Sequence, residues 1–253
     1  MDTSKSIGSA ICQTGLYDLS VSESLARLLP GGGLFVDVGA NVGYMSLLGG
    51  LVVGKSGRML SFEPNPALRD ILKENLRQLD RNRNVAVEVF DSALGEKRGR
   101  AELIVPGDYS GNDGVAFIGK GLWAENGDQV YEVGIERLDD IIPETSVDVM
   151  KVDVEGHELS VLKGASSLLE HKRIRHIIFE EHKGPDSPVC SYLSKLGYTL
   201  YSLGWRTFGP ACMTIEKGEL RRDFEPNNYL ATIDSESVVQ AMRPRGWRVI
   251  GKL

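Results

Sequence analysis

The sequence predicts a doubly wound α/β fold, in which helices cover both faces of a mostly parallel sheet. Short apolar runs rich in β-branched residues alternate with stretches whose leucines recur at helical spacing, and many of the 29 glycines lie in short loops between them. The runs of strand length are Leu34–Val38, Arg58–Phe62, Val85–Phe90, Val147–Val154 and Ile174–Phe179. Because strand and helix alternate, we expect right-handed βαβ units and hence a parallel sheet.

Helices are expected before the first strand and after the second. Ser22 is the expected N-cap of the first helix, within an N-terminal helical segment over residues 1–30 that precedes the main domain, residues 31–253. Asn65 and Pro66 supply a cap residue and a first-turn proline for the helix that follows the second strand. The chain is thus expected to form one principal domain.

A third helix and two unusual segments complete the prediction. The apolar stripe over Leu159–Leu169 follows the fourth strand directly and predicts a helix. Pro106–Asp128 and Gly204–Asn228 fit neither periodicity. Long inserts in a compact domain are usually functional loops, so we expect these two segments to shape a substrate site.

Composition narrows the classes of partner. The 253 residues carry a formal charge of −6 and no basic run, so nucleic acid is not an expected partner. The sequence has no apolar stretch of about 18 residues, the length needed to span a membrane, and its N-terminus does not resemble a signal peptide. Three widely spaced cysteines form no disulfide framework, so we expect a cytoplasmic protein, and a homo-oligomer stays compatible with the sequence.

The first strand runs into a glycine loop of the kind that binds nucleosides. Gly39 and Gly43 allow a ligand to approach the backbone at a helix N-terminus. Glu63, 24 residues after Gly39, ends the second strand, where a carboxylate can accept hydrogen bonds from both ribose hydroxyls. The spacing of these glycines is G-x-x-x-G rather than the dinucleotide pattern G-x-G-x-x-G, which weakens an NAD interpretation.

The fourth strand ends in three carboxylates. In a doubly wound sheet the first and fourth strands are neighbours, so Asp153 is expected to open onto the same crevice as Gly39. A charge at the end of a buried strand is costly unless a ligand or partner meets it, which makes Asp153 a candidate functional residue. Glu155 and Glu158 lie in the first turn of the next helix, where they complement the helix dipole.

The fifth strand ends in Glu180, Glu181 and His182. Because this strand neighbours the fourth, one of the two glutamates, with or without His182, is expected to point into the same crevice. These side chains could act as a base, or they could join Asp153 in holding a hard cation such as Mg²⁺. The metal-free alternative is the one we favour.

Several motifs together resemble the FkbM family of methyltransferases. They are Val36-Asp37-Val38-Gly39-Ala40-Asn41-Val42-Gly43-Tyr44, Phe62-Glu63-Pro64-Asn65, Ala93-Leu94-Gly95, Leu138-Asp139, Lys151-Val152-Asp153-Val154-Glu155-Gly156-His157-Glu158, and Asn228-Tyr229-Leu230-Ala231. The resemblance covers about residues 20–232, and its most specific part is the Asp-x-Glu-Gly-x-Glu segment. It implies a Rossmann-like class I methyltransferase fold.

The resemblance also implies S-adenosylmethionine as the cofactor and an oxygen as the methyl acceptor, often on a sugar or natural product. It places residues at the three parts of the cofactor. Asp37, Gly39, Asn41 and Gly43 would line the methionine end, Glu63 would hold the ribose, and Asp91, Ser92 and Ala93 would contact the adenine.

Transfer of a methyl group to a hydroxyl requires removal of a proton. Asp153 is the first candidate base, and Glu180 and His182 are the second candidates, either as bases or as ligands of a cation that lowers the pKa of the hydroxyl. Two other functions stay open at this point: an NAD-dependent oxidoreductase of Rossmann type, and a non-catalytic module that binds a nucleoside.

Overall fold

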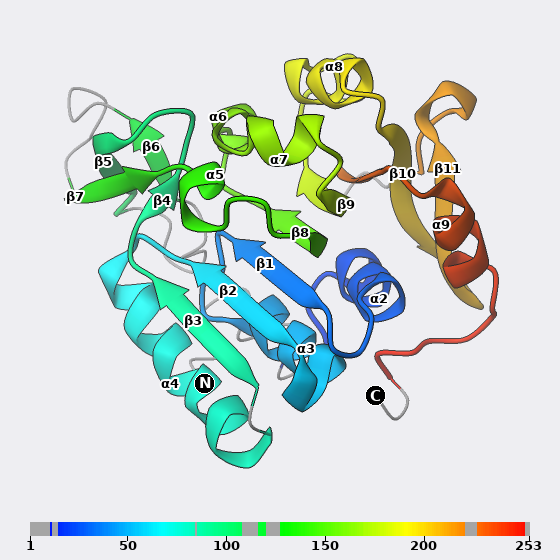
Figure 1. Ribbon diagram of the computed structural model, residues 1–253, viewed down its shortest axis with the longest axis horizontal. Coiled ribbons are helices and arrows are strands. Elements are labelled where there is room, and N and C mark those ends of the chain that lie inside the picture. The colour runs from blue at the N-terminus through cyan, green and yellow to red at the C-terminus, as the bar shows by residue number, and fades with distance from the viewer. Residues whose placement is uncertain are drawn as a thin grey trace.

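A computed structural model describes residues 11, 15–83, 85–107, 116–119, 127–220 and 227–250, and within them the strands form two sheets (Figure 1). The larger sheet contains β1 (Leu34–Val38), β2 (Arg58–Phe62), β3 (Ala86–Phe90), β8 (Val147–Val152), β9 (Ile174–Glu180), β10 (Thr199–Arg206), β11 (Gly209–Thr214) and β12 (Asn228–Thr232). Its strand order is β11-β10-β12-β9-β8-β1-β2-β3. The five strands from β9 to β3 pair in parallel, and the pairs that involve β12, β10 and β11 are antiparallel. The predicted doubly wound, mostly parallel α/β fold is confirmed.

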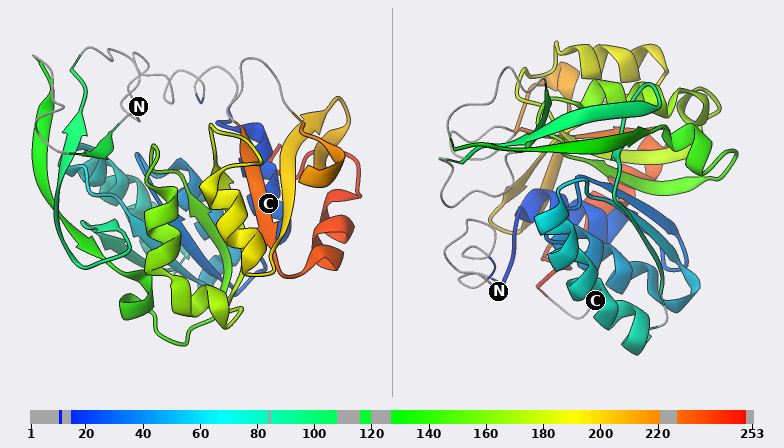
Figure 2. Two further views of the ribbon diagram at one scale, coloured as in Figure 1. Left: turned by 90° about the horizontal axis from the view of Figure 1, so that it is seen from above. Right: turned by 90° about the vertical axis from the view of Figure 1, so that its left-hand side faces the viewer.

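Helices cover both faces of this sheet, as Figures 1 and 2 show. They are α2 (Leu19–Leu28), α3 (Tyr44–Val53), α4 (Pro66–Arg83), α5 (Leu138–Ile141), α6 (Glu158–Gly164), α7 (Ser166–Glu170), α8 (Pro188–Lys195) and α9 (Ser235–Met242), with short 3₁₀ turns at Gly54–Ser56 and Ile215–Lys217. The side chains of α2, α3, α4 and α9 pack into one apolar core, and those of α5 to α8 pack into a second. The sheet lies between the two cores, and its carboxyl edge is left open for a site.

The second sheet is an insertion between β3 and β8. It contains β4 (Ala93–Leu94), β5 (Gly99–Val105), β6 (Phe117–Gly119) and β7 (Gln129–Glu136) in the order β4-β7-β5-β6. The sequence prediction missed these strands, because β5 and β7 are half exposed and carry few buried apolar residues. Residues 108–115 and 120–126 of the predicted 106–128 insert lie outside the described residues.

Two local predictions need correction. Asp18, not Ser22, is the N-cap of α2: its Oδ1 accepts a hydrogen bond from the backbone N–H of Val21. Ser22 is buried inside the helix and donates its hydroxyl to the carbonyl of Tyr17. The expected single helix over Leu159–Leu169 is two short helices, α6 and α7, which meet at Ala165.

The second unusual segment, Gly204–Asn228, is built around an antiparallel hairpin. Strands β10 and β11 pair from Tyr201 with Thr214 to Arg206 with Gly209, which extends the main sheet at its edge. Residues 221–226 of this segment lie outside the described residues, as do residues 1–10 and 12–14 of the predicted N-terminal segment.

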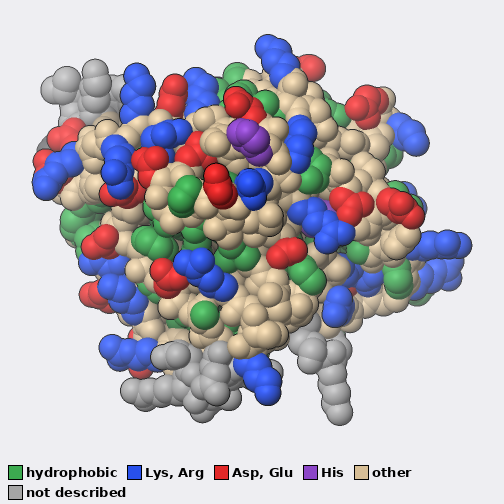
Figure 3. Space-filling view, in the orientation of Figure 1, with side chains coloured by type: hydrophobic (Ala, Val, Ile, Leu, Met, Phe, Trp, Pro, Cys, Tyr) green, Lys and Arg blue, Asp and Glu red, His purple; other side chains and the backbone are tan. Residues whose placement is uncertain are grey.

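Charged side chains of both signs are interspersed over the face drawn in Figure 3. This pattern accompanies a formal net charge of −6 for the whole chain. Among the described residues, no helix combines the length and the apolar character that a membrane crossing requires.

Candidate active site

A cavity of about 320 Å³ lies at the carboxyl ends of β1, β2, β8 and β9. The loop after β1 and the end of β2 form one wall, and the loop after β8 forms another. Residues of the second sheet, including Leu103 and Ile118, close a third side. A volume near 300 Å³ is at the lower end of the range for small-molecule sites, which run from about 300 to 1,000 Å³.

The loops after β1 and β8 approach each other closely at Gly39. Its φ angle is +76°, and a Cβ atom there would collide with the carbonyl oxygen of Asp153. The backbone N–H of Asp153 donates to the carbonyl of Val38, and the N–H of Gly39 donates to that of Phe62. Only glycine fits this position, because any side chain would push the two loops apart.

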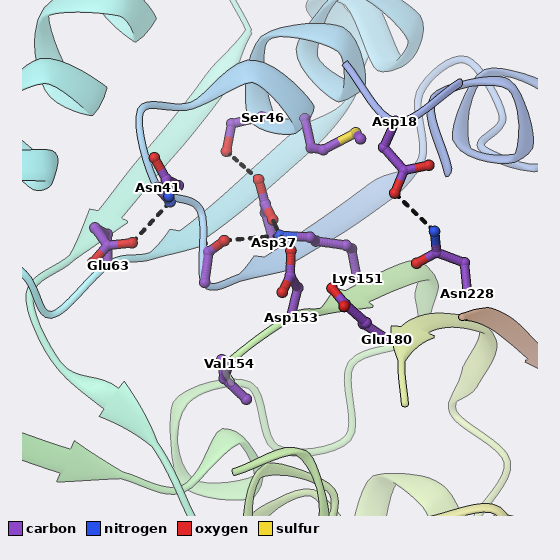
Figure 4. A network of polar contacts seen from close by, with 12 residues as sticks. Asp18, Asp37, Asn41, Ser46, Glu63, Lys151, Asp153, Val154, Glu180 and Asn228 are labelled. Atoms are coloured by element: carbon purple, nitrogen blue, oxygen red, sulfur yellow. Dashed lines mark hydrogen bonds and ion pairs between the residues drawn. The ribbon is translucent and has the colours of Figure 1, made fainter. Parts of the chain in front are cut away.

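Glu63 fixes the glycine loop from the end of β2. Its Oε2 accepts a hydrogen bond of 2.8 Å from the backbone N–H of Asn41 (Figure 4). Its Oε1 accepts one of 2.9 Å from the backbone N–H of Asn65. Burial raises the pKa of Glu63, and the two backbone hydrogen bonds oppose that rise. Glu63 and Asn41 both line the cavity, whereas Gly43 caps α3 behind it.

A buried polar cluster lies beneath the cavity. Its central residue, Lys151, was not singled out from the sequence. Asp37 is fully buried, and its Oδ2 accepts a hydrogen bond of 2.6 Å from the Ser46 hydroxyl. Its Oδ1 lies 3.6 Å from the ammonium of Lys151 on the adjacent strand β8. The structure therefore places Asp37 behind the cavity wall. A lysine inside the apolar run Val147–Val152 was the available signal.

The three carboxylates after β8 occupy different environments. Asp153 lines the cavity, with its Oδ2 3.3 Å from the Lys151 ammonium, and Glu155 also lines it. Glu158 instead folds the loop, because its Oε1 accepts hydrogen bonds from the backbone N–H groups of Val154 and Gly156. The Asp-x-Glu-Gly-x-Glu segment thus combines two cavity carboxylates with one that holds their loop.

Glu180 lines the cavity at the end of β9, whereas its two neighbours point elsewhere. Burial, together with the negative charges of Asp153 and Glu155, raises the pKa of Glu180 to about 8. Nε2 of His182 lies 3.3 Å from Oε1 of Glu180, and the imidazole is 65% exposed. Glu181 accepts a hydrogen bond from the backbone N–H of Lys183 and lies outside the cavity wall.

The residues expected at the adenine end divide between two places. Ala93 lines the cavity, whereas Asp91 and Ser92 border a separate open groove beside Arg69. Asp91 is 78% exposed and lies 3.8 Å from the Arg69 guanidinium. Tyr17, which precedes α2 and was not anticipated, also lines the cavity.

Metal ligands do not gather at this site in the part of the chain that the structure describes: no three His, Cys, Asp or Glu side chains there are grouped so that they could hold an ion. Three of the carboxylates that line the cavity have other partners: Asp153 pairs with Lys151, Glu63 accepts from backbone N–H groups, and Glu180 lies beside His182.

Comparison with known proteins decides the family. The model of the methyltransferase FkbM domain matches residues 37–200, which include the glycine loop, Glu63 and the Asp-x-Glu-Gly-x-Glu segment. The chain is a member of the FkbM methyltransferase family. Of the enzyme classes that the sequence left open, methyltransferase is therefore the one that holds.

Two similar proteins are themselves named as methyltransferases. Methyltransferase sdnD of Sordaria araneosa is 30% identical over 201 residues, which are 68% of this chain and 76% of sdnD. The hexuronic acid methyltransferase AglP of Haloferax volcanii is 30% identical over 154 residues, 59% of this chain and 56% of AglP. Among solved structures, an S-adenosylmethionine-dependent O-methyltransferase from Thermotoga maritima aligns with a TM-score of 0.49 at 14% identity, covering 89% of this chain and 70% of that one.

Proposed function

We propose that this FkbM protein is an S-adenosylmethionine-dependent O-methyltransferase that acts on a hydroxyl group of a small molecule such as a sugar or a natural product. The observation that carries the proposal is the Glu63 carboxylate, fixed by two backbone N–H groups at the wall of a cavity that begins at the glycine loop. The relative AglP, named for a sugar acid, supports a small-molecule acceptor of the carbohydrate class.

The residues around the cavity fit this cofactor. Each Glu63 oxygen keeps a free lone pair for a ribose hydroxyl, since it accepts one backbone hydrogen bond. The cavity wall carries more carboxylates than cations, which suits a sulfonium ligand. When bound, S-adenosylmethionine supplies a methyl group on a sulfonium, whose leaving group departs as a neutral thioether. The protein therefore needs no acid for that departure.

Glu180 is the base that we propose for the acceptor hydroxyl. A carboxylate is an effective base at neutral pH when its pKa is raised toward the working pH, and the pKa of Glu180 is raised to about 8. Asp153 is the weaker candidate, because its Oδ2 is already engaged by the Lys151 ammonium 3.3 Å away. In the proposed reaction the acceptor oxygen forms a bond to the methyl carbon, the hydroxyl proton passes to Glu180, and His182 orients the carboxylate from outside.

The acceptor is proposed to lie between Glu180 and the second sheet. Ala116 and Ile118, from the predicted 106–128 insert, line the cavity together with the loop after β8. Apolar side chains at this position would pack against the acceptor body, while Tyr17 offers a hydroxyl from the other side.

The test is methyl transfer by the purified protein from methyl-labelled S-adenosylmethionine to a panel of neutral sugars, hexuronic acids and hydroxylated natural products. We expect a methyl ether together with one equivalent of S-adenosylhomocysteine. A methyl ester of a hexuronic acid, or an N-methyl product, would keep the methyltransferase assignment but contradict transfer to a hydroxyl.

A further inference from the structure

Lys151 is the one lysine or arginine that lines the cavity within the described residues. Its Nζ donates a hydrogen bond of 2.8 Å to the carbonyl oxygen of Gly39. The same nitrogen lies 3.3 Å from Oδ2 of Asp153 and 3.6 Å from Oδ1 of Asp37 (Figure 4). The ammonium thus makes one hydrogen bond and lies within ion-pair distance of two carboxylates. Those oxygens belong to β1, to the loop after β1 and to the loop after β8.

Ionisable groups, most of them acidic, lie near this ammonium on several of the elements that meet at the cavity. They are Asp37 on β1, Glu63 after β2, Asp153, Glu155 and Glu158 around the loop after β8, Tyr17 and Asp18 ahead of α2, and Glu180 with its neighbour His182 at the end of β9. Burial alone lowers the pKa of Lys151, but Asp153 and Asp37 outweigh that effect and raise it. Lys151 therefore stays charged among these carboxylates.

We propose that Lys151 is a positioning residue for methyl transfer: its ammonium holds the Gly39 carbonyl and the Asp153 carboxylate in place and moderates the negative charge around Glu180. This inference rests on the proposed function for its catalytic meaning. The contacts of Lys151 with Gly39, Asp153 and Asp37 do not depend on a ligand, so they can be tested in the protein alone.

The positioning effect follows from the contacts that two carboxylates and one carbonyl would lose without the ammonium. Asp37 on β1 and Asp153 after the adjacent strand β8 would then have no cation between them. Two negative charges at such a site repel each other. The Gly39 carbonyl would lose its donor, and the loop that carries Asn41 would lose an anchor to β8. Lys151 thus holds both the glycine loop after β1 and the Asp153 carboxylate after β8.

The effect on Glu180 is electrostatic. Burial and the charges of Asp153, Glu155 and Asp18 raise the pKa of Glu180, and Lys151 lowers it. Removal of the ammonium should therefore move this pKa further upward. A lysine that only filled space in β8 would leave the titration of Glu180 unchanged.

The working variant is the double substitution Lys151→Met with Asp37→Asn. Lys151→Met alone leaves the Asp37 carboxyl buried without its cation, which threatens folding, whereas the double variant removes both buried ionisable groups and keeps side-chain size. Asp37→Asn alone is the matched control, since it retains the contacts of Lys151 with Gly39 and Asp153. Circular dichroism confirms that each variant is folded.

The first measurement is the titration of the Glu180 carboxyl carbon by ¹³C NMR in protein without ligand, assigned by its absence in Glu180→Gln. We expect a midpoint near 8 in the wild type, a midpoint higher by about half a unit or more in the double variant, and little change in Asp37→Asn. An unchanged or lower midpoint in the double variant would overturn the proposal.

The second measurement is calorimetric binding of S-adenosylhomocysteine. We expect the folded double variant to bind it at least about tenfold more weakly than Asp37→Asn, because the Gly39 loop has lost its anchor. Equal affinities would overturn the positioning role. If the wild type itself does not bind S-adenosylhomocysteine, the proposed function fails, and the NMR titration still decides the role of Lys151.

Discussion

The carboxylate of Glu180 lies 3.3 Å from Nε2 of His182, between the cavity, which it lines, and an imidazole that is 65% exposed to solvent. A proton taken up by Glu180 therefore has a neighbouring group through which it can reach water. This arrangement makes Glu180, rather than a fully enclosed carboxylate, the group on which the proposed chemistry depends.

Glu180→Gln should lower turnover by about 10² to 10⁴, because the amide keeps the shape of the side chain but cannot accept the acceptor proton. Turnover by the wild type should rise with pH to a midpoint near 8, the raised pKa of Glu180. Affinity for S-adenosylmethionine should stay close to that of the wild type. Glu170→Gln, a change at an exposed position on α7, is the control. Near-normal turnover by Glu180→Gln would move the base to Asp153.

The same substitution should change how stability depends on pH. The pKa of Glu180 is about 8 when folded and near 4.5 when unfolded, so the protonated form favours folding. That contribution is fully present below pH 4.5 and is lost as the pH rises to 8, at about 1.4 kcal/mol per pKa unit. In urea unfolding, the free energy of unfolding of Glu180→Gln relative to that of the wild type should be higher at pH 9 than at pH 5. A constant difference between the two proteins would contradict this.

Gly39→Ala should destabilise the fold more than an ordinary substitution at positive φ. Gly39 and Gly184 have φ angles of +76° and +80°, but a Cβ at residue 39 meets the Asp153 carbonyl whereas one at residue 184 meets nothing within 4 Å. The backbone cost is thus matched, and the collision should add about 1–3 kcal/mol. Urea unfolding of both alanine variants measures the difference. Equal losses would mean that the β1 and β8 loops separate easily.

His176 should make the protein sensitive to acid. Burial lowers the pKa of this histidine from 6.5 to about 4, and its Nδ1 lies 2.9 Å from the Thr232 hydroxyl. The neutral form favours folding, so its contribution is present above pH 6.5 and is lost as the pH falls to 4. His176→Gln should show a weaker loss of stability across that interval in urea unfolding. An identical pH dependence in both proteins would assign the acid sensitivity elsewhere.

The sequence predicted the parallel half of the fold because those strands are buried on both faces. Leu34–Val38 and Arg58–Phe62 are strands with the expected bounds, and β1 lies beside β8 as the fold rule requires. The second sheet was not predicted, because most residues of β5 and β7 are exposed or half exposed, Glu102 and Glu132 among them. Such strands are stabilised by pairing with each other, which local periodicity does not reveal.

Site residues could be predicted where they lie at the ends of neighbouring parallel strands. They could not be predicted where their positions depend on loop folding or on the register between strands. Glu63 and Asn41 meet because consecutive parallel strands end at one edge. The separation of Asp153, Glu155 and Glu158 depends on a loop that Glu158 itself folds. The position of Lys151 between Asp37 and Asp153 depends on the register of β1 with β8, which no spacing along the chain encodes.

Calorimetric titration with S-adenosylmethionine tests the central claim most directly, with wild type, Glu63→Gln and the exposed control Glu88→Gln compared under one condition. We predict that the wild type and the control bind alike. Glu63→Gln should bind at least tenfold more weakly, because each ribose hydrogen bond to a charged group is worth about 1.5–3 kcal/mol. Heat with NAD but none with S-adenosylmethionine, or equal affinity of Glu63→Gln and wild type, would contradict the proposed cofactor site.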